Sequence, residues 1–166
     1  MKLEIERKFL LKAMPDVEPT EKITIEQWYW KNPSGTWERA RTWHSNIHGK
    51  SWIHTIKKSV SKGVNIEDEK NLTEQEFKSF ISKCKQPKQE AKFISKERWI
   101  YPSNELKWEI DKFDKNHCLI IAEIEIPKKS FKIEIPHFIQ EKLIVEVTGI
   151  KQFSNRNLSD YIQNNN

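Results

Sequence analysis

Apolar and polar residues alternate through most of the chain with a period of two, which is typical of β-strands. In KWEIDKF (107–113), for example, Trp108 and Ile110 alternate with acidic residues. Successive side chains of a strand point to opposite faces, so each such segment has one apolar and one charged face. The alternation predicts eight strands, at residues 2–12, 22–31, 36–46, 50–60, 63–71, 91–102, 105–114 and 118–127.

A helical pattern interrupts the strands at 73–86. Thr73 and Glu76 have the spacing of a capping box, which starts a helix. Apolar residues then recur on one side of that helix, at Phe77, Phe80, Ile81 and Cys84. The chain therefore contains at least one amphipathic helix that can cover the outside of a sheet.

The remaining elements are short. We expect a brief helix near Pro136, a strand at 144–148 and a final helix from about Ser154. The length of 166 residues favours one domain, over 1–160, with a frayed C-terminal tail at 161–166. Eight similar strands with short connections are enough to close an antiparallel barrel that can hold one small ligand. The predicted fold is all-β dominated, an eight-stranded closed antiparallel barrel with a few flanking helices.

Charged residues occur as pairs two positions apart, and most pairs have a single sign. The acidic pairs are Glu4 and Glu6, Glu67 and Glu69, Glu109 and Asp111, and Glu123 and Glu125; the basic pairs are Arg39 and Arg41, and Lys96 and Arg98. A solvated sheet face normally mixes signs, because like charges opposite one another are destabilising. The other faces are apolar, at Leu106, Trp108, Ile110, Ala122, Ile124 and Ile126. We therefore expect the charges to line the barrel lumen and the apolar faces to lie outside.

Acidic and basic side chains in a barrel lumen could each bind part of a ligand. Converging carboxylates bind hard cations such as Mg²⁺ or Mn²⁺, while arginine and lysine bind phosphate oxygens. A lumen with both would hold a metal-bound polyphosphate. Glu4 and Glu6 share one strand face and repel each other, so we expect a cation between them.

The composition is that of a soluble globular protein, with 36% hydrophobic and 32% charged residues and a net charge of +5, which favours anionic partners. No stretch approaches the roughly 20 apolar residues of a membrane span, and no signal peptide pattern is present. We expect a cytoplasmic protein without a membrane partner, with Cys84 and Cys118 as free thiols. The histidines lack zinc-site spacing, and no glycine-rich phosphate loop occurs.

The segment EIERK at 4–8 resembles the Glu-x-Glu-x-Lys signature of the CYTH family, the triphosphate tunnel metalloenzymes. Further segments resemble that family in the same order: QWYW at 27–30, Arg39 and Arg41, TIK at 55–57, Glu67 and Glu69, Lys96 and Arg98, WEIDKF at 108–113, AEIEI at 122–126, EVTG at 146–149 and FSN at 153–155. The resemblance implies an eight-stranded barrel open at both ends that hydrolyses triphosphates with Mg²⁺ or Mn²⁺.

The resemblance also implies roles for individual residues. The implied metal ligands are Glu4, Glu6, Asp111, Glu123 and Glu125, with Glu67, Glu69, Glu109 and Glu146 in the same acidic neighbourhood. The implied phosphate-binding residues are Lys8, Arg39, Arg41, Lys57, Lys96 and Arg98, together with Lys151. Tyr29 matches a position near the end of the substrate that works with Lys96. We expect Lys8, Arg39, Arg41, Lys57, Lys96 and Tyr29 to be the catalytic residues.

Two positions depart from the family pattern, because Asn65 and Gln152 stand where arginine is common. Their effect on the substrate stays open. The leading hypothesis is hydrolysis of inorganic tripolyphosphate to diphosphate and phosphate. The alternatives are a thiamine triphosphatase, a nucleotide or RNA 5′-triphosphatase, a class IV adenylate cyclase, and a polyphosphate-binding barrel without chemistry. The class IV cyclases resemble the chain less, since their signature begins further upstream. We expect a small anionic partner rather than nucleic acid, and the oligomeric state, with a homodimer as one alternative, stays open.

Overall fold

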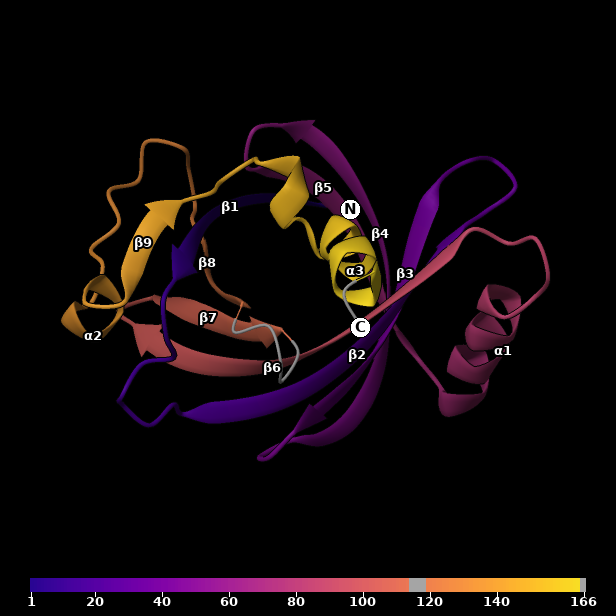
Figure 1. The fold of residues 1–166 in the computed structure, drawn as a ribbon, viewed down its shortest axis with the longest axis horizontal. Helices are drawn as coiled ribbons and strands as arrows, with labels where there is room; N and C mark the ends of the chain where they lie inside the picture. The colour runs from indigo at the N-terminus through magenta and orange to yellow at the C-terminus, as the bar shows by residue number, and fades with distance from the viewer. Residues whose placement is uncertain (114–118, 165–166) are drawn as a thin grey trace.

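Eight antiparallel strands close into a barrel in the computed structural model, which describes residues 1–113 and 119–164 (Figure 1). The strands are β1 (Lys2–Leu11), β2 (Glu21–Lys31), β3 (Trp37–Ser45), β4 (Gly49–Ser61), β5 (Val64–Leu72), β6 (Ala91–Ser103), β7 (Leu106–Phe113), β8 (Leu119–Glu125) and the additional β9 (Leu143–Glu146). The helices are α1 (Glu74–Cys84), α2 (His137–Gln140), the 3-10 turn η1 (Lys151–Phe153) and α3 (Asn155–Asn164). The predicted barrel is confirmed. Residue 118, where the eighth strand was expected to begin, lies outside the described residues.

Strand β1 closes the barrel by pairing with different strands along its length. The sheet runs in the order β5-β4-β3-β2-β6-β7-β8-β1-β9, and an extra β5–β1 pairing joins its ends. The first part of β1, Lys2–Ile5, pairs with β5. Its second part, Glu6–Leu11, pairs with β8, and from Phe9 onward it also pairs with β9. Strand β9 therefore continues the wall where β5 has turned away.

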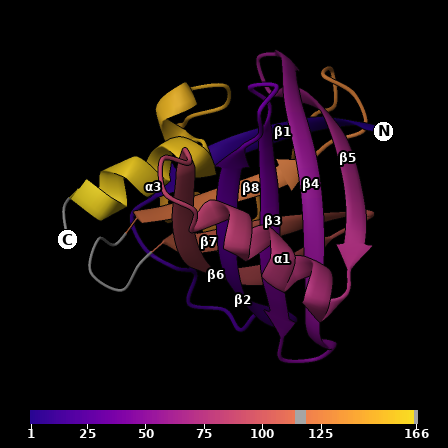
Figure 2. The same ribbon diagram turned by 90° about the vertical axis from the view of Figure 1, so that its right-hand side faces the viewer.

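Two apolar regions of the outer face of the barrel are covered by other segments of the chain, as expected where charges line the lumen. Helix α1 lies across the outside of β2, β3 and β4, where Phe77 and Phe80 pack against Trp30 and Ala40 (Figure 2). The segment 126–143, with α2, covers the other side. Its Ile139 packs in one cluster with the predicted outer residues Trp108, Ile110, Ala122, Ile124 and Ile126. These two outer regions are thereby removed from water. A separate apolar cluster, Ile23, Ile25 and Ile100 with Trp43, lies on the same strand faces as Lys96 and Arg98 and fills part of the lumen.

Helix α3 lies at one end of the barrel (Figures 1 and 2). Leu158 and Ile162, one helical turn apart, pack against Tyr29, Ile94, Phe113 and Ile121. The frayed tail predicted from residue 161 is therefore wrong for 161–164, because α3 continues to Asn164 and Ile162 is only 8% exposed. No helix in the described residues is long and apolar enough to cross a membrane. Cys84 is a free thiol, whereas Cys118 lies outside the described residues.

The turn between β4 and β5 makes a close backbone contact with β1. The Glu6 amide donates to the Gly63 carbonyl at 2.8 Å. Gly63 has a φ of 68°, and a Cβ there would lie 2.7 Å from the Glu6 carbonyl oxygen and 2.8 Å from Cγ2 of Thr148. Only glycine satisfies both the positive φ and this approach.

We predict that Gly63→Ala destabilises the protein more than Gly35→Ala. Both substitutions place alanine at positive φ, which costs about 1–2 kcal/mol. A Cβ at Gly35 would meet nothing within 4 Å, whereas the one at Gly63 must displace β1 backbone, which adds about 1–3 kcal/mol. Urea unfolding of the two variants measures the difference. Equal losses in the free energy of unfolding would contradict a tight β1 contact at Gly63.

Candidate active site

A polar tunnel runs inside the barrel as two adjoining cavities of about 790 and 730 Å³. Glu6, Lys8, Arg39, Lys57 and Asn155 line both of them. We call the larger cavity the first chamber. Lys2, Glu69, Glu109, Glu123 and Glu125 line only this one. The second chamber lies toward η1 and α3 and is lined in addition by residues such as Tyr29, Lys62, Asn65 and Lys151. Each chamber has the volume of a small-molecule site.

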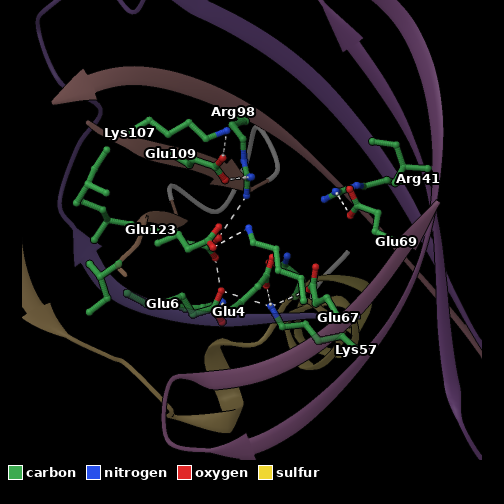
Figure 3. Close-up of a pocket in the computed structure, with 18 of the residues that line it drawn as sticks. Glu4, Glu6, Arg41, Lys57, Glu67, Glu69, Arg98, Lys107, Glu109 and Glu123 are labelled. Carbon is green, nitrogen blue, oxygen red and sulfur yellow. Dashed lines mark hydrogen bonds and ion pairs between the residues drawn. The ribbon is translucent and has the colours of Figure 1, made fainter. Parts of the chain in front are cut away.

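Three carboxylates converge on one lysine in the first chamber (Figure 3). Nζ of Lys57 lies 3.2 Å from Oε2 of Glu4, 3.4 Å from Oε2 of Glu6 and 3.0 Å from Oε1 of Glu67. We call these four residues the acidic triad and its lysine. The β1–β5 and β4–β5 pairings bring them together from three adjacent strands. The cation expected between Glu4 and Glu6 is, in this structure, the Lys57 ammonium.

The carboxylates of the triad do not share one electrostatic environment. Burial raises the pKa of Glu4 to about 7, and although Lys57 acts in the opposite direction, the nearby Glu67 adds to the increase. Burial would also raise the pKa of Glu67, but Lys57 and Arg39 outweigh it and lower that pKa. One lysine therefore does not neutralise the cluster completely, and a further positive charge would be favourable there.

A second cluster surrounds Glu123 on β8. Nζ of Lys8 lies 3.0 Å from Oε1 of Glu123 and 3.6 Å from Oε1 of Glu6, and Nη2 of Arg98 lies 3.3 Å from Oε2 of Glu123. Burial alone would raise the pKa of Glu123, but Lys8, Lys96 and Arg98 together lower it well below its usual value. Glu123 is therefore a permanent negative charge in the tunnel at neutral pH.

Arg98 and Lys96 hold Asp111 in the wall. Asp111 is fully buried and accepts from Nζ of Lys96 at 2.5 Å and from Nε of Arg98 at 2.6 Å. Arg98 also pairs with Glu109 (Figure 3). Burial, together with the neighbouring Arg98, lowers the pKa of Lys96 to about 8. Asp111, expected as a metal ligand, lines neither chamber.

Arg39 and Arg41 on β3 carry donors without partners. Arg39 donates from Nη2 to Oγ1 of Thr55 at 3.1 Å, and Arg41 donates from Nη2 to Oε2 of Glu69 at 2.9 Å. The Nε atoms of both arginines are buried and have no hydrogen-bond partner among the described residues. Burial, with the nearby Arg39, lowers the pKa of Arg41 to about 10. Unsatisfied buried donors are costly, so these two favour an anionic ligand in the tunnel.

Most of the residues expected at the site line the first chamber. These are Glu4, Glu6, Lys8, Arg39, Arg41, Lys57, Glu67, Glu69, Lys96, Arg98, Glu109, Glu123 and Glu125. Glu125 stands at the edge, where it pairs with Lys2 at 2.7 Å and its side chain is 48% exposed. Tyr29 and Lys151 line only the second chamber.

Glu146, expected among the acidic residues of the site, is not brought there. Both of its carboxylate oxygens accept from Arg7, at 2.9 Å and 2.7 Å, and it lines neither chamber. The reason is that β9 extends the wall beside the second half of β1, away from the triad. The expected partnership of Tyr29 with Lys96 is also replaced, because the Tyr29 hydroxyl accepts from Gln27 at 3.1 Å.

Several tunnel residues were given no role from the sequence. Thr55 and Asn155 stood only within the family-like segments TIK and FSN, and Lys62 and Arg156 were not singled out. Thr55 could have been found from its position two residues before Lys57, since both share a strand face. Of the two departures from the family pattern, Asn65 lies in the second chamber and donates to Glu6 at 3.3 Å. Gln152 is exposed on η1 and lines neither chamber.

The triad provides the donor set for a hard cation, although lysine and arginine side chains now separate the acids. Among residues 1–113 and 119–164, no three acidic, histidine or cysteine side chains are grouped closely enough to hold a metal ion. The three carboxylates nevertheless aim at one point, within 3.4 Å of the Lys57 ammonium. Carboxylate oxygens are the ligands of Mg²⁺ and Mn²⁺, so these residues fit such a cation in place of the ammonium.

A closed eight-stranded tunnel with a charged lumen is the CYTH fold. The chain shares this fold with the inorganic triphosphatase NE1496, at 23% identity over 96% of this chain and 95% of that one, with a TM-score of 0.58. It is also similar to HpAC1 from Hippeastrum, an adenylyl cyclase candidate with a dominant triphosphatase activity, at 15% identity over 75% of this chain and 80% of that one, with a TM-score of 0.52. No protein-family model and no curated protein sequence matches the chain.

Proposed function

We propose that this chain hydrolyses a triphosphate, most simply inorganic tripolyphosphate to diphosphate and phosphate. The observation that carries the proposal is the juxtaposition in one tunnel of a convergent acidic triad with the unpartnered donors of Arg39 and Arg41. A pure anion-binding site would gain nothing from three carboxylates, because they repel phosphate unless a cation neutralises them. The proteins that share the fold include two with triphosphatase activity, which supports the same chemistry here.

Glu4, Glu6 and Glu67 would hold the divalent cation. When bound, Mg²⁺ or Mn²⁺ supplies charge neutralisation at the phosphates and activates water for attack. Lys57 would then be free to turn from the carboxylates toward a phosphate oxygen. No side chain of the tunnel needs to act as a nucleophile in this chemistry.

The basic residues of the tunnel would bind and orient the phosphate chain. Arg39 and Arg41 offer buried guanidinium donors from one strand, and Lys8 faces them from β1. Hydrogen bonds from fixed cations stabilise the charge that develops on the transferred phosphoryl group and on its leaving oxygen. Thr55 and Glu69 already hold the guanidinium groups of Arg39 and Arg41 in place, so these two side chains need little reorganisation when the substrate arrives.

We predict that the protein releases phosphate from tripolyphosphate with Mg²⁺ or Mn²⁺ and that EDTA abolishes this release. Parallel assays with ATP and thiamine triphosphate identify the alternative substrates on the same fold. Faster phosphate release from ATP or from thiamine triphosphate would identify that compound, in place of tripolyphosphate, as the preferred substrate. Release that continues undiminished in EDTA would contradict the role of the acidic triad.

One observation favours a second candidate, a polyphosphate-binding barrel without chemistry. Lys57 already occupies the point where the triad carboxylates converge, and Arg98 pairs with Glu123, so protein cations stand where a metal would bind. Such a barrel would show a raised melting temperature with tripolyphosphate in EDTA, no phosphate release under any metal condition, and no response to Mg²⁺ alone.

A further inference from the structure

The two chambers of the tunnel differ in charge. Acidic and basic residues are equal in number along the first chamber. The second chamber has one acidic residue, Glu6, at its junction with the first. Its basic residues are Lys8, Arg39, Lys57, Lys62, Lys151 and Arg156. A cavity with this balance attracts anions and offers no carboxylate set for a metal.

The cations that belong only to the second chamber have no acidic partner within ion-pair distance among the described residues, although Lys62 is near enough to Glu146 to help lower the pKa of that carboxyl. Lys62, Lys151 and Arg156 form no ion pair with any residue of the described ranges. At the first chamber, by contrast, Lys2 pairs with Glu125 at 2.7 Å and Lys107 with Glu109 at 2.8 Å. The first turn of α3 also lines the second chamber, so the positive end of that helix adds to its potential.

The aromatic residues of the second chamber are already engaged, which argues against an organic ring as its ligand. Three cations lie around the Trp37 ring: Lys31 at 5.8 Å, Lys92 at 5.5 Å and Arg156 at 5.1 Å from its centroid. Tyr29 is only 8% exposed and packs with Leu158 of α3. Phe153, the third aromatic residue of this chamber, packs against the same cluster as Tyr29. These contacts disfavour the stacking of a base or a thiazolium on the aromatic rings.

We propose that the second chamber binds the distal phosphates of a linear polyphosphate longer than three units, while the terminal phosphates occupy the first chamber. This inference rests on the proposed function, since it assigns the same tunnel a longer substrate of the same chemistry. Lys8, Arg39 and Lys57 line both chambers and so provide a continuous basic path between them. Hydroxyl and amide groups, at Ser59, Ser61 and Asn65, supply neutral donors along the rest of the path.

The test compares the binding of tripolyphosphate and linear hexaphosphate to the full chain by calorimetry in EDTA, where no hydrolysis interferes. We expect hexaphosphate to bind at least about tenfold more tightly, since one hydrogen bond to a charged group is worth about that factor. The Lys62→Gln/Arg156→Gln variant should lose this advantage. Lys62→Gln alone, which leaves the Trp37 contact intact, should lose part of it.

A matched control removes the same charge from the outside of the barrel. Lys78→Gln/Lys85→Gln changes α1 and its C-terminal cap, and it should keep the preference for hexaphosphate. Equal affinity of the wild-type protein for the two phosphates would overturn the inference. An equal loss of affinity for tripolyphosphate and hexaphosphate in the Lys62→Gln/Arg156→Gln variant would also overturn it. So would a wild-type protein that binds ATP or thiamine triphosphate more tightly than hexaphosphate.

The failure of the proposed function gives a different result. If the protein prefers hexaphosphate in EDTA but releases no phosphate with Mg²⁺ or Mn²⁺, polyphosphate binding in the second chamber is supported and the proposed hydrolysis is contradicted. If the protein hydrolyses tripolyphosphate but binds both lengths equally, hydrolysis is supported and polyphosphate binding in the second chamber is contradicted.

Discussion

Replacing Glu4 and Glu6 together by glutamine is expected to lower metal-dependent phosphate release from tripolyphosphate by about a thousandfold, because a bound metal supplies several kcal/mol of charge stabilisation. Both carboxylates lie within 3.4 Å of the position that Lys57 now holds, and glutamine keeps their size but removes their charge. The measurement is kcat as a function of Mg²⁺ and Mn²⁺ concentration, with circular dichroism to confirm that the barrel is intact. Lys57 keeps its contact with Glu67 in this variant, so we expect the fold to be retained.

Glu146→Gln is the matched control for this prediction. It makes the same chemical change in an acid that pairs with Arg7 outside the tunnel. We expect its kcat to lie within about twofold of the wild-type value, with a stability loss of about 1 kcal/mol or less, because exposed pairs contribute little. If the Glu4/Glu6 variant were as active as this control, the triad would have no part in catalysis.

The architecture could be predicted from the sequence because charged and apolar side chains alternate regularly along most of the strands. The residues Trp108, Ile110 and Ala122 were expected outside the lumen, and they form part of the outer core. The sign of each charged pair further indicated an interior that holds both a cation and an anion. These inferences needed only the face of each strand, which the period of two provides.

The depth and the neighbours of each residue could not be predicted in the same way. Asp111 lies on the strand face that points toward the tunnel. The β6–β7 register places it directly opposite Arg98, and the ion pair between them keeps its carboxylate buried in the wall instead of exposed to the cavity. Glu146 belongs to a four-residue strand whose place beside β1 depends on where β5 turns away. The end of α3 was underestimated because the packing of Ile162 against the barrel is a tertiary contact that the local sequence does not reveal.

Asp111→Asn is expected to lower the free energy of unfolding by about 3–5 kcal/mol, the usual result when one partner of a buried ion pair is removed. Asp111 is fully buried and serves both Lys96 and Arg98. Lys96, whose pKa burial has already lowered to about 8, can release its proton when the carboxylate is lost. Arg98 cannot do so, and its desolvated charge therefore accounts for most of the loss.

Urea unfolding at neutral pH measures this loss, and Glu109→Gln is its control. Glu109 also pairs with Arg98, but its side chain is 18% exposed and its removal leaves the Asp111 contact in place, so the loss should be clearly smaller. The comparison also decides the role of Asp111. A structural carboxylate in the wall predicts a large loss of stability that Mg²⁺ does not change. A metal ligand would instead give a variant of near-normal stability whose activity requires far more Mg²⁺, and that result would contradict the wall position.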